Sequence, residues 1–413
     1  MRLPFRLMYD WLERAALRRP DTVALDAVGD RRLTYTELWE AAQDAAVTLL
    51  GQSGGAPTVE LRGTGSEFAI GLHAALLSGV AAVPIDPRLG PDELQVRSVR
   101  GELPYAHVAT VMFTSGTTSA PKPVYLTLRN WEANAIGSAL ALGLDPQERW
   151  LCVMPLAHVG GLSILLRSTL YATTVILRER FDTEAVLGEL MDPARAVTLV
   201  SLVPTMLARL LDAGLERPPT LRWALLGGGP IPQPLLERAE RSGVPVAPSY
   251  GMTEGCSQIA TFGVPLHGVQ LRIVDGEVVV RGPGLAANTL DEAGWLRTGD
   301  LGEFDPSGRL RIVGRRSDTI VTGGENVAPA EVEAMLLEHP AVADAGVFAR
   351  MDSEWGERVV AAVVLRAGHS VTPAELQGFV GARLARFKVP KEIGFADALP
   401  RTVSGKLLRR ELR

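Results

Sequence analysis

The chain has 413 residues, of which 46% are hydrophobic and 22% charged, and its mean hydropathy is +0.13. This length predicts two or three domains with substantial cores, and the composition excludes intrinsic disorder, collagen and disulfide-rich scaffolds. The net charge of -5 and the pI near 5.8 lack the basic excess that binding to a nucleic-acid backbone requires. We therefore expect small-molecule partners and no nucleic acid; a homo-oligomer stays open.

Three features indicate the compartment. Cys152 and Cys256 are the only cysteines and both lie in apolar surroundings, which suits a reducing compartment and provides neither a disulfide framework nor a thiolate metal site. Asp10 and Glu13 interrupt the N-terminus before an apolar segment of signal-peptide length can form. The weakly polar run at 69–83 is too short and too broken to span a bilayer. We expect a cytoplasmic protein.

Apolar, β-branched runs alternate with helix-like stretches from residue 22 to residue 242. Thr22–Leu25, Val108–Phe113 and Trp223–Leu226 are typical of strands, whereas Leu38–Leu50 and Trp131–Leu142 are typical of helices. Such alternation predicts an α/β fold in which βα units build parallel-type sheets.

The pattern changes twice further along the chain. After Gly255, short strand signals separated by turn residues predict a small, more antiparallel β region. Beyond residue 315 we expect an α+β unit whose elements are a helix from Pro329, strands at 341–348 and 358–365, and a helix at 373–384. The predicted layout is a large N-terminal α/β domain over 1–315 and a small, mobile C-terminal domain over 316–413.

The segment Thr114-Ser-Gly-Thr-Thr-Ser-Ala-Pro-Lys122 directly follows a predicted strand. Its hydroxyl and backbone N–H groups would donate hydrogen bonds to phosphate oxygens, and Lys122 adds a positive charge. The donors come from Thr114, Ser115, Gly116, Thr117 and Thr118. A Walker P-loop ends in Gly-Lys-Ser/Thr, whereas prolines flank Lys122. Taken alone, the segment suits a phosphate loop and an ordinary polar turn equally.

Two carboxylates stand in further motifs. In Pro248-Ser-Tyr-Gly-Met-Thr-Glu254, the Glu254 carboxylate offers the hard oxygen that Mg²⁺ prefers. The same residue also suits the first turn of a helix without any ligand. In Thr298-Gly-Asp300, we expect a tight turn whose Asp300 carboxylate accepts hydrogen bonds from ribose hydroxyls, although aspartate is common in turns.

Two more motifs lie towards the C-terminus. Gly314-Arg-Arg-Ser-Asp-Thr-Ile-Val-Thr-Gly-Gly-Glu-Asn-Val-Ala-Pro-Ala-Glu-Val-Glu333 is rich in glycine and charge, and Pro400-Arg-Thr-Val-Ser-Gly-Lys406 places a lysine in a loop. A solvated tail lysine is the simplest reading of Lys406 alone. Together and in this order, the five segments resemble the adenylate-forming superfamily of acyl-CoA synthetases, non-ribosomal peptide adenylation domains and luciferases.

The resemblance implies an active site between a large and a small domain, and a reaction in two halves. A carboxylate attacks the α-phosphate of Mg·ATP to form an acyl-adenylate and pyrophosphate, and a thiol, here CoA, then displaces AMP. Lys406 would bridge the carboxylate and the α-phosphate, Lys122 and the hydroxyl loop would hold pyrophosphate, and Glu254 would ligate Mg²⁺. The remaining nucleotide residues would be Asp300 and Arg315 at the ribose, with Gly227, Gly228, Gly229, Tyr250, Gly251 and Thr253 around the base and phosphates.

The resemblance also implies a domain rotation between the two half-reactions. The pivot maps to Ser317, and the rotation would bring Gly323 and Gly324 to the thiol channel. The sequence departs from the superfamily at Ser119 and Pro123, where glycine is usual; we expect a stiffer phosphate loop, and the details of its phosphate contacts stay open. The chain is also shorter than most members because much of the usual N-terminal subdomain is reduced.

Within the superfamily, the chain most closely resembles the o-succinylbenzoate-CoA ligases of menaquinone biosynthesis, and compact aryl- and acyl-CoA ligases share parts of the match. Arg167 supports this independently, because it is the one charge in an apolar, helix-like stretch and a buried guanidinium needs an anion. The ring carboxylate of o-succinylbenzoate would supply that anion. An internal salt bridge or a side chain reaching the surface would also satisfy Arg167.

Ser201, polar in an apolar strand, and His158 are further candidates for the acid pocket, although a lone histidine is more often structural. Three alternatives to an o-succinylbenzoate ligase follow from the same motifs. They are a ligase for another aryl or acyl acid, a stand-alone adenylation enzyme that loads a carrier protein, and a binding protein without turnover. The last is disfavoured because a binder has no need of Lys406.

Overall fold

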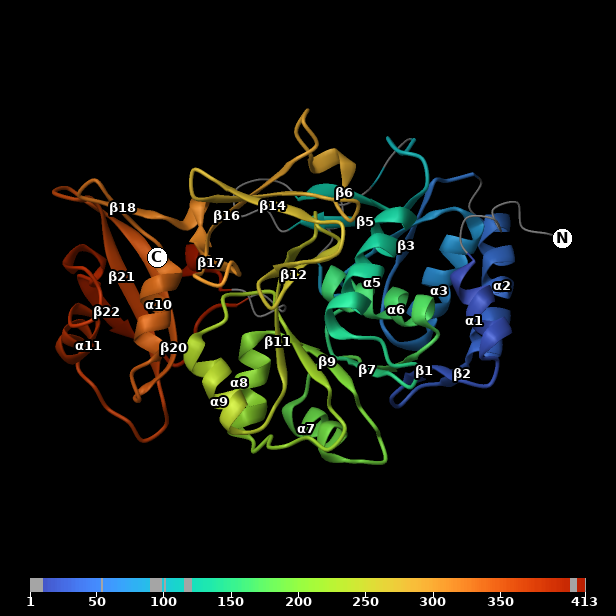
Figure 1. The fold of residues 1–413 in the computed structure, drawn as a ribbon, viewed down its shortest axis with the longest axis horizontal. Helices are drawn as coiled ribbons and strands as arrows, with labels where there is room; N and C mark the ends of the chain where they lie inside the picture. Colours follow the sequence, from blue (N-terminus) through green and yellow to red (C-terminus); the bar gives the residue numbers. More distant parts are fainter. Residues whose placement is uncertain are drawn as a thin grey trace.

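The computed structural model describes residues 10–52, 55–89, 99, 102–114, 121–401 and 407–412. Four sheets organise these residues (Figure 1), and the largest has nine strands in the order β13-β12-β11-β10-β9-β7-β8-β1-β2. Its six central strands run parallel, from β11 to β1, and the strands at both ends are antiparallel. The parallel strands are β1 (Val23–Ala27), β7 (Arg149–Cys152), β8 (Thr174–Leu177), β9 (Leu199–Leu202), β10 (Trp223–Leu226) and β11 (Val246–Met252). The end strands are β2 (Arg32–Thr34), β12 (Ser257–Thr261) and β13 (Val264–Pro265).

A second sheet has four strands in the order β3-β4-β5-β6. Its strands are β3 (Thr58–Leu61), β4 (Ala81–Pro84), β5 (Val108–Thr114) and β6 (Lys122–Thr127). One apolar core joins both sheets, because Leu25 and Val175 of the first and Ala82 and Met112 of the second belong to the same buried cluster. The helices in this layer are α1 (Trp11–Arg18), α2 (Tyr35–Gln52), α3 (Gly65–Ser78), α5 (Leu128–Leu142) and α6 (Val159–Tyr171).

The other face of the nine-stranded sheet is covered by α7 (Thr183–Met191), α8 (Pro204–Asp212) and α9 (Gln233–Arg241). Leu207 and Leu210 of α8 pack with Leu202 and Leu226 at the sheet in a second buried cluster. Helices on both faces explain why these strands read as continuous apolar runs rather than alternating ones. The predicted α/β architecture with parallel-type sheets is confirmed.

The antiparallel region expected after Gly255 is also confirmed. It is a four-stranded meander of β14 (Gln270–Val274), β15 (Glu277–Arg281), β16 (Leu296–Phe304) and β17 (Leu310–Arg315). Asp300 lies within β16, so the prediction that it occupies a tight turn is wrong. Asp300 pairs with Arg315 at the end of the β16–β17 ladder, and a turn-like conformation is found at the preceding residue, Gly299, whose φ is 72°.

The C-terminal part has a sheet and core of its own (orange to red in Figure 1). After the short 3₁₀ helix at Arg316–Asp318, its strands are β18 (Ile320–Thr322), β19 (Glu325–Val327), β20 (Val342–Asp352), β21 (Gly356–Leu365) and β22 (Glu392–Phe395). Its helices are α10 (Pro329–Leu337) and α11 (Pro373–Gly381). Thr372 and Glu375 form a capping box at the start of α11, which fixes that boundary where the sequence predicts it.

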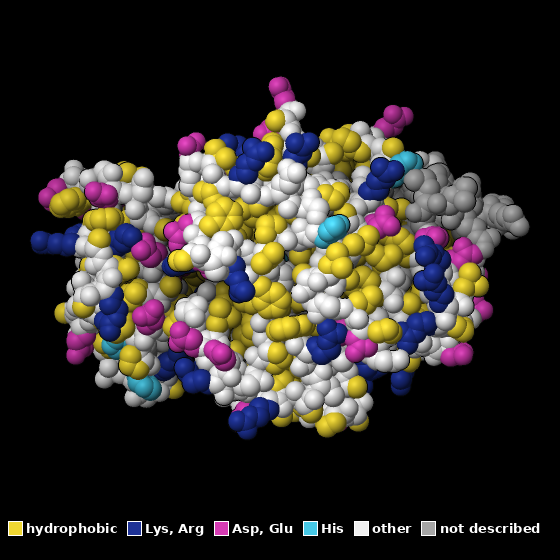
Figure 2. Space-filling view, in the orientation of Figure 1, with side chains coloured by type: hydrophobic (Ala, Val, Ile, Leu, Met, Phe, Trp, Pro, Cys, Tyr) yellow, Lys and Arg dark blue, Asp and Glu magenta, His cyan; other side chains and the backbone are white. Residues whose placement is uncertain are grey.

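Figure 2 shows Lys and Arg side chains interspersed with Asp and Glu over one face of the molecule, as the balanced composition suggests. Within the described ranges, no helix has both the length and the apolar character needed to cross a bilayer.

Candidate active site

The hydroxyl-rich segment joins the antiparallel strands β5 and β6. Thr114 pairs with Lys122 in the ladder, so the two ends of the segment are held side by side. Asn288 ties β6 further, because its Nδ2 donates to the Pro123 carbonyl over 2.9 Å. The predicted phosphate donors Ser115, Gly116, Thr117 and Thr118, together with Ser119, lie outside the described residues, so their role stays a prediction.

Tyr250, Asp300 and Arg315 come together from three strands. The Tyr250 hydroxyl donates to Asp300 Oδ2 over 2.9 Å, and Arg315 Nε donates to Asp300 Oδ1 over 2.7 Å. Burial and the neighbouring Asp300 carboxylate raise the pKa of the Tyr250 hydroxyl, so Tyr250 is a neutral donor at physiological pH. Each carboxylate oxygen can accept a second hydrogen bond, so Asp300 is anchored at both ends and still able to receive hydroxyls.

Glu254 lies in a turn over residues 253–256 between β11 and β12, so its alternative reading as a helix N-terminal residue is wrong. The turn is strained, because Cys256 and Ser257 have φ angles of 54° and 91°, in a region that residues other than glycine rarely adopt. Its backbone is braced by Ala286, whose N–H donates to the Glu254 carbonyl over 2.9 Å. The Glu254 carboxylate is near enough to Arg315 to raise that residue's pKa, although burial acts in the opposite direction.

The Glu254 environment fits a magnesium ion that arrives with a nucleotide. Mg²⁺ binds one or two protein carboxylates and keeps water and phosphate oxygens as its other ligands. The Glu254 carboxylate, beside the Asp300–Arg315 pair, offers one such protein ligand.

The glycines at 227–229 follow β10, beside β11. A Cβ on Gly227 would come within 2.9 Å of the carbonyl oxygen of Ser249 in the middle of β11, so only glycine allows this close approach. Gly228 has a φ of 79°, which also favours glycine. The glycine segment therefore lies beside Ser249, the residue that precedes Tyr250 in β11.

Arg167 in α6 is buried, with 2% of its surface exposed. Its Nη2 donates to Asn134 Oδ1 in α5, and its guanidinium carbon lies 5.7 Å from the ring centroid of Trp150. Nε is buried without a hydrogen-bond partner, and no carboxylate among the described residues forms an ion pair with this side chain. The side chain therefore does not reach the surface, and the described residues provide no internal salt bridge for it.

Ser201 lies close to Arg167 through a shared neighbour. The Trp150 indole N–H donates to Ser201 Oγ over 3.1 Å, while the same indole ring faces Arg167. His158 immediately precedes α6 in an extended conformation, and it lies near Asp86 at the end of β4. Burial would raise the pKa of the Asp86 carboxyl, but hydrogen bonds from Arg88 and the charge of His158 hold it below its usual range.

The C-terminal motifs are only partly described. Gly323 and Gly324 form the turn between β18 and β19 with φ angles of 59° and 83°, and the Gly323 N–H donates to the Trp355 carbonyl over 2.9 Å. Lys406 lies outside the described residues, and the residues on either side of its segment, Arg401 and Leu407, form a β-bridge.

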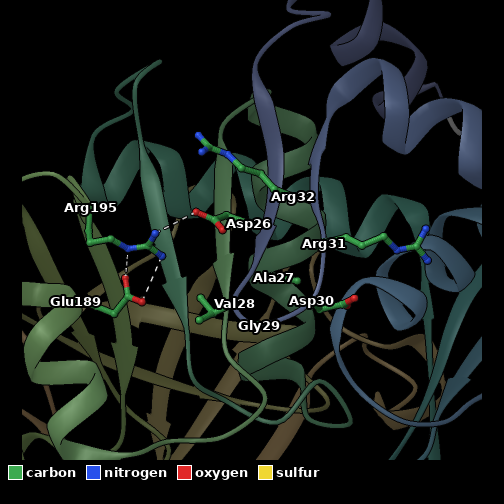
Figure 3. Close-up of a pocket in the computed structure, with 9 residues that line it drawn as sticks. All are labelled: Asp26, Ala27, Val28, Gly29, Asp30, Arg31, Arg32, Glu189 and Arg195. Carbon is green, nitrogen blue, oxygen red and sulfur yellow. Dashed lines mark hydrogen bonds and ion pairs between the residues drawn. The ribbon is translucent and has the colours of Figure 1, made fainter.

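A cavity of about 440 Å³ lies elsewhere, at the β1–β2 edge (Figure 3). Several charged residues that line the cavity form ion pairs with one another or with a neighbour. Glu189 pairs with Arg195 and, at 2.7 Å, with Arg178, and Asp26 lies 3.5 Å from Arg195. None of the residues of the five motifs lines it. We therefore place the candidate active site at the motifs rather than in this cavity.

Sequence reasoning missed the residues that connect Arg167 to the turn that carries Glu254. Asn134 donates from Nδ2 to the carbonyls of Gln258, at 2.8 Å, and Gly255, at 3.4 Å, and accepts from Arg167. Ser257 Oγ lies 3.4 Å from Ser163 Oγ at the start of α6. Asn134 is a polar residue within the predicted helix Trp131–Leu142, so it could have been singled out from the sequence. The contacts of Ser257 depend on the turn geometry and could not be predicted in this way.

Two family models match the chain. The AMP-binding enzyme model covers residues 12–105 and 97–288, and the model of the AMP-binding enzyme C-terminal domain covers residues 331–406. Together they extend over both the nine-stranded sheet and the C-terminal sheet.

Similar proteins of known name and structure also exist. A 2-succinylbenzoate–CoA ligase of Bacillus cereus is 37% identical over 98% of both chains, and one of Bacillus licheniformis is 38% identical over 98% of this chain and 99% of its own length. The o-succinylbenzoate CoA synthetase of Bacillus subtilis in complex with the acyl-adenylate intermediate is 36% identical, with a TM-score of 0.87 over 98% of both chains. The chain is therefore a member of the AMP-binding enzyme family.

Proposed function

We propose that this protein is an AMP-forming acid–CoA ligase that activates o-succinylbenzoate and transfers it to CoA. The observation that carries the choice of acid is Arg167, a buried cation without a carboxylate partner among the described residues. A substrate that keeps one ionised carboxylate while the other reacts supplies the missing anion. Similarity to 2-succinylbenzoate–CoA ligases supports the same choice.

In the first half-reaction, a carboxylate oxygen of the acid forms a bond to the α-phosphorus of ATP, and the bond from that phosphorus to the pyrophosphate leaving group breaks. The products are an acyl-adenylate and pyrophosphate. Because anions approach one another, the step needs cations at the reacting oxygens. We assign Lys406 to the bridge between carboxylate and α-phosphate, and Lys122 with Thr114, Ser115, Gly116, Thr117 and Thr118 to the outgoing pyrophosphate.

The nucleotide is assigned to the site between β10, β11 and β16. Asp300 accepts hydrogen bonds from the ribose hydroxyls while Tyr250 and Arg315 hold its carboxylate in place. The base lies between Tyr250 and the glycines at 227–229, with Gly251 and Thr253 in the adjoining turn. Glu254 would hold Mg²⁺, which screens the phosphate charges when bound.

The acid is assigned to the space beside α6. Arg167 binds the second carboxylate, and Ser201 and His158 complete the pocket. Burial lowers the pKa of Arg167, because a charged guanidinium loses its hydration there. Guanidinium groups remain charged in proteins, so a bound carboxylate regains part of the lost solvation energy.

In the second half-reaction, the CoA sulfur forms a thioester bond to the acyl carbon and the bond from that carbon to AMP breaks. We propose that the C-terminal domain, residues 316–413, rotates about Ser317 between the steps. The rotation withdraws Lys406 and brings Gly323 and Gly324 to the thiol channel. The domain 1–315 stays fixed and retains the adenylate.

The test is pyrophosphate release by the purified enzyme with ATP, Mg²⁺ and CoA over a panel of acids. We expect o-succinylbenzoate to give the highest kcat/KM. A stronger response to another aryl or acyl acid would identify that acid as the substrate instead. Adenylation without CoA thioester formation would indicate a carrier-loading enzyme, and no pyrophosphate release with any acid would contradict the ligase assignment.

A further inference from the structure

The partner of Arg167 is a neutral amide rather than a carboxylate. Arg167 Nη2 donates to Asn134 Oδ1, and both groups are buried, with 2% and 4% of their surfaces exposed. An aspartate at position 134 would form an ion pair of the kind that usually satisfies a buried arginine. Asn134 instead accepts the hydrogen bond through a neutral amide oxygen, which does not cancel the positive charge of Arg167.

The orientation of the Asn134 amide is set by its other contacts. Its Nδ2 faces the carbonyl oxygens of Gln258, at 2.8 Å, and Gly255, at 3.4 Å. A carbonyl only accepts hydrogen bonds, so the NH₂ group must point at them and the amide oxygen must point at Arg167. The backbone of the turn that carries Glu254 thereby fixes the direction of the guanidinium.

Among the described residues, no group that acts on Arg167 carries a negative charge at neutral pH. The titratable groups that act on it are Tyr171 and Cys256. Burial raises the pKa of the Tyr171 hydroxyl to about 12 and raises that of the Cys256 thiol well above its usual range. Both groups are neutral, and Trp150 faces the guanidinium with an uncharged ring.

We propose that Asn134 is a positioning residue for the acid substrate: it aims the Arg167 guanidinium and leaves its positive charge available to the second carboxylate. The proposal rests on the function proposed above for Arg167. It predicts that the charge at position 134 controls the preference for acids that carry a second carboxylate, and that this control acts only through Arg167.

The experiment compares o-succinylbenzoate with 4-oxo-4-phenylbutanoate, which keeps the reacting chain and lacks the ring carboxylate. In Asn134→Asp, the new carboxylate pairs with Arg167, so kcat/KM for o-succinylbenzoate should fall at least tenfold relative to kcat/KM for the analogue. Asn134→Ala keeps the charge of Arg167 but loses its orientation, so a smaller fall in this ratio is expected. Arg167→Gln, alone and combined with Asn134→Asp, provides the matched background.

The predicted result is that Asn134→Asp has no further effect on the ratio once Arg167 is replaced. An equal loss of activity towards both acids in Asn134→Asp and Asn134→Ala would show a structural role only and would overturn the proposal. An undiminished preference for o-succinylbenzoate in both variants would overturn it as well. A wild-type enzyme without any preference for the second carboxylate would instead overturn the function proposed for Arg167, and this inference with it.

Discussion

The Tyr250 hydroxyl and the Asp300 carboxylate meet across 2.9 Å, which joins β11 of the nine-stranded sheet to β16 of the antiparallel meander. Arg315 holds the other carboxylate oxygen at 2.7 Å. Tyr250 belongs to the nine-stranded sheet, whereas Asp300 and Arg315 belong to the antiparallel meander. Both donors can therefore hold the Asp300 carboxylate only when the two sheets have formed. In the function proposed here, this contact positions Asp300 for the ribose of the nucleotide.

Replacing Tyr250 with Phe should raise the KM for ATP about tenfold with a smaller change in kcat. The reason is that a buried carboxylate oxygen loses its hydrogen-bond donor, at a cost of about 1–3 kcal/mol, and Asp300 is then less firmly placed for the ribose. Steady-state kinetics at saturating acid provides the measurement. Tyr105→Phe is the matched control, because the Tyr105 ring packs at a tilt against Tyr125, with ring centroids 6.0 Å apart, and its hydroxyl is not the donor to Asp300. An unaltered KM for ATP in Tyr250→Phe would refute the role of this contact.

Replacing Arg167 with Gln should raise the KM for o-succinylbenzoate at least tenfold and leave the KM for ATP nearly unchanged. The variant removes the cation that the second carboxylate would meet. Arg209→Gln, at an exposed position of α8, is the control for loss of an arginine. If the preference between dicarboxylate and monocarboxylate acids is the same as in the wild type, Arg167 does not bind the substrate.

Gly251→Ala should lower the melting temperature and the affinity for ATP together. A Cβ at this position would overlap the carbonyl oxygen of Ser257, so the turn that carries Glu254 has to move; overpacking of this kind costs about 1–3 kcal/mol. Gly188→Ala is the control, because nothing lies within 4 Å of a Cβ there and alanine favours the helix. Wild-type ATP affinity in Gly251→Ala would show that the turn tolerates displacement.

The stability of the protein should fall with pH below about 6.5 because of His73. Burial lowers the pKa of this histidine to about 4, against an ordinary value of about 6.5, so the folded state keeps it neutral where the unfolded chain binds a proton. The stabilising contribution is complete above pH 6.5, declines as the pH falls, and amounts to about 3 kcal/mol when lost at pH 4. Urea unfolding of the wild type and His73→Asn across this range measures it. A parallel decline in both proteins would assign the effect to other groups, and His369→Gln, at an exposed position, controls for removal of a histidine.

Lys406→Ala should abolish adenylation and leave thioester formation from supplied acyl-adenylate largely intact. The prediction follows from a lysine that acts at the α-phosphate and is withdrawn before CoA reacts. The two half-reactions are measured separately, as pyrophosphate release and as CoA-dependent release of AMP. Equal loss in both would show that Lys406 is needed for the fold or for CoA rather than for adenylation.

The alternation of strands and helices, the antiparallel region after Gly255 and the capped helix at Pro373 could all be predicted because each depends on local patterning. The strand placement of Asp300 could not, because it depends on pairing with Arg315 at the end of another strand. Gly251 also looks like an ordinary turn glycine in the sequence, and only the folded contact with Ser257 shows why it is required.

The candidate site was predictable where motifs carry it and unpredictable where tertiary contacts do. Arg167 was identified because a charge in an apolar helix is conspicuous, but its partner Asn134 lies in a different helix and no spacing rule connects them. The link from Ser201 to Arg167 likewise passes through Trp150, whose neighbours are set by the order of strands in the sheet.

The most direct test of the central claim is the product formed by the purified enzyme from ATP, Mg²⁺, o-succinylbenzoate and CoA, analysed by mass spectrometry. The account predicts o-succinylbenzoyl-CoA with one AMP and one pyrophosphate per turnover, and an acyl-adenylate that accumulates when CoA is withheld. Formation of ADP, or thioester formation without an adenylate intermediate, would contradict it.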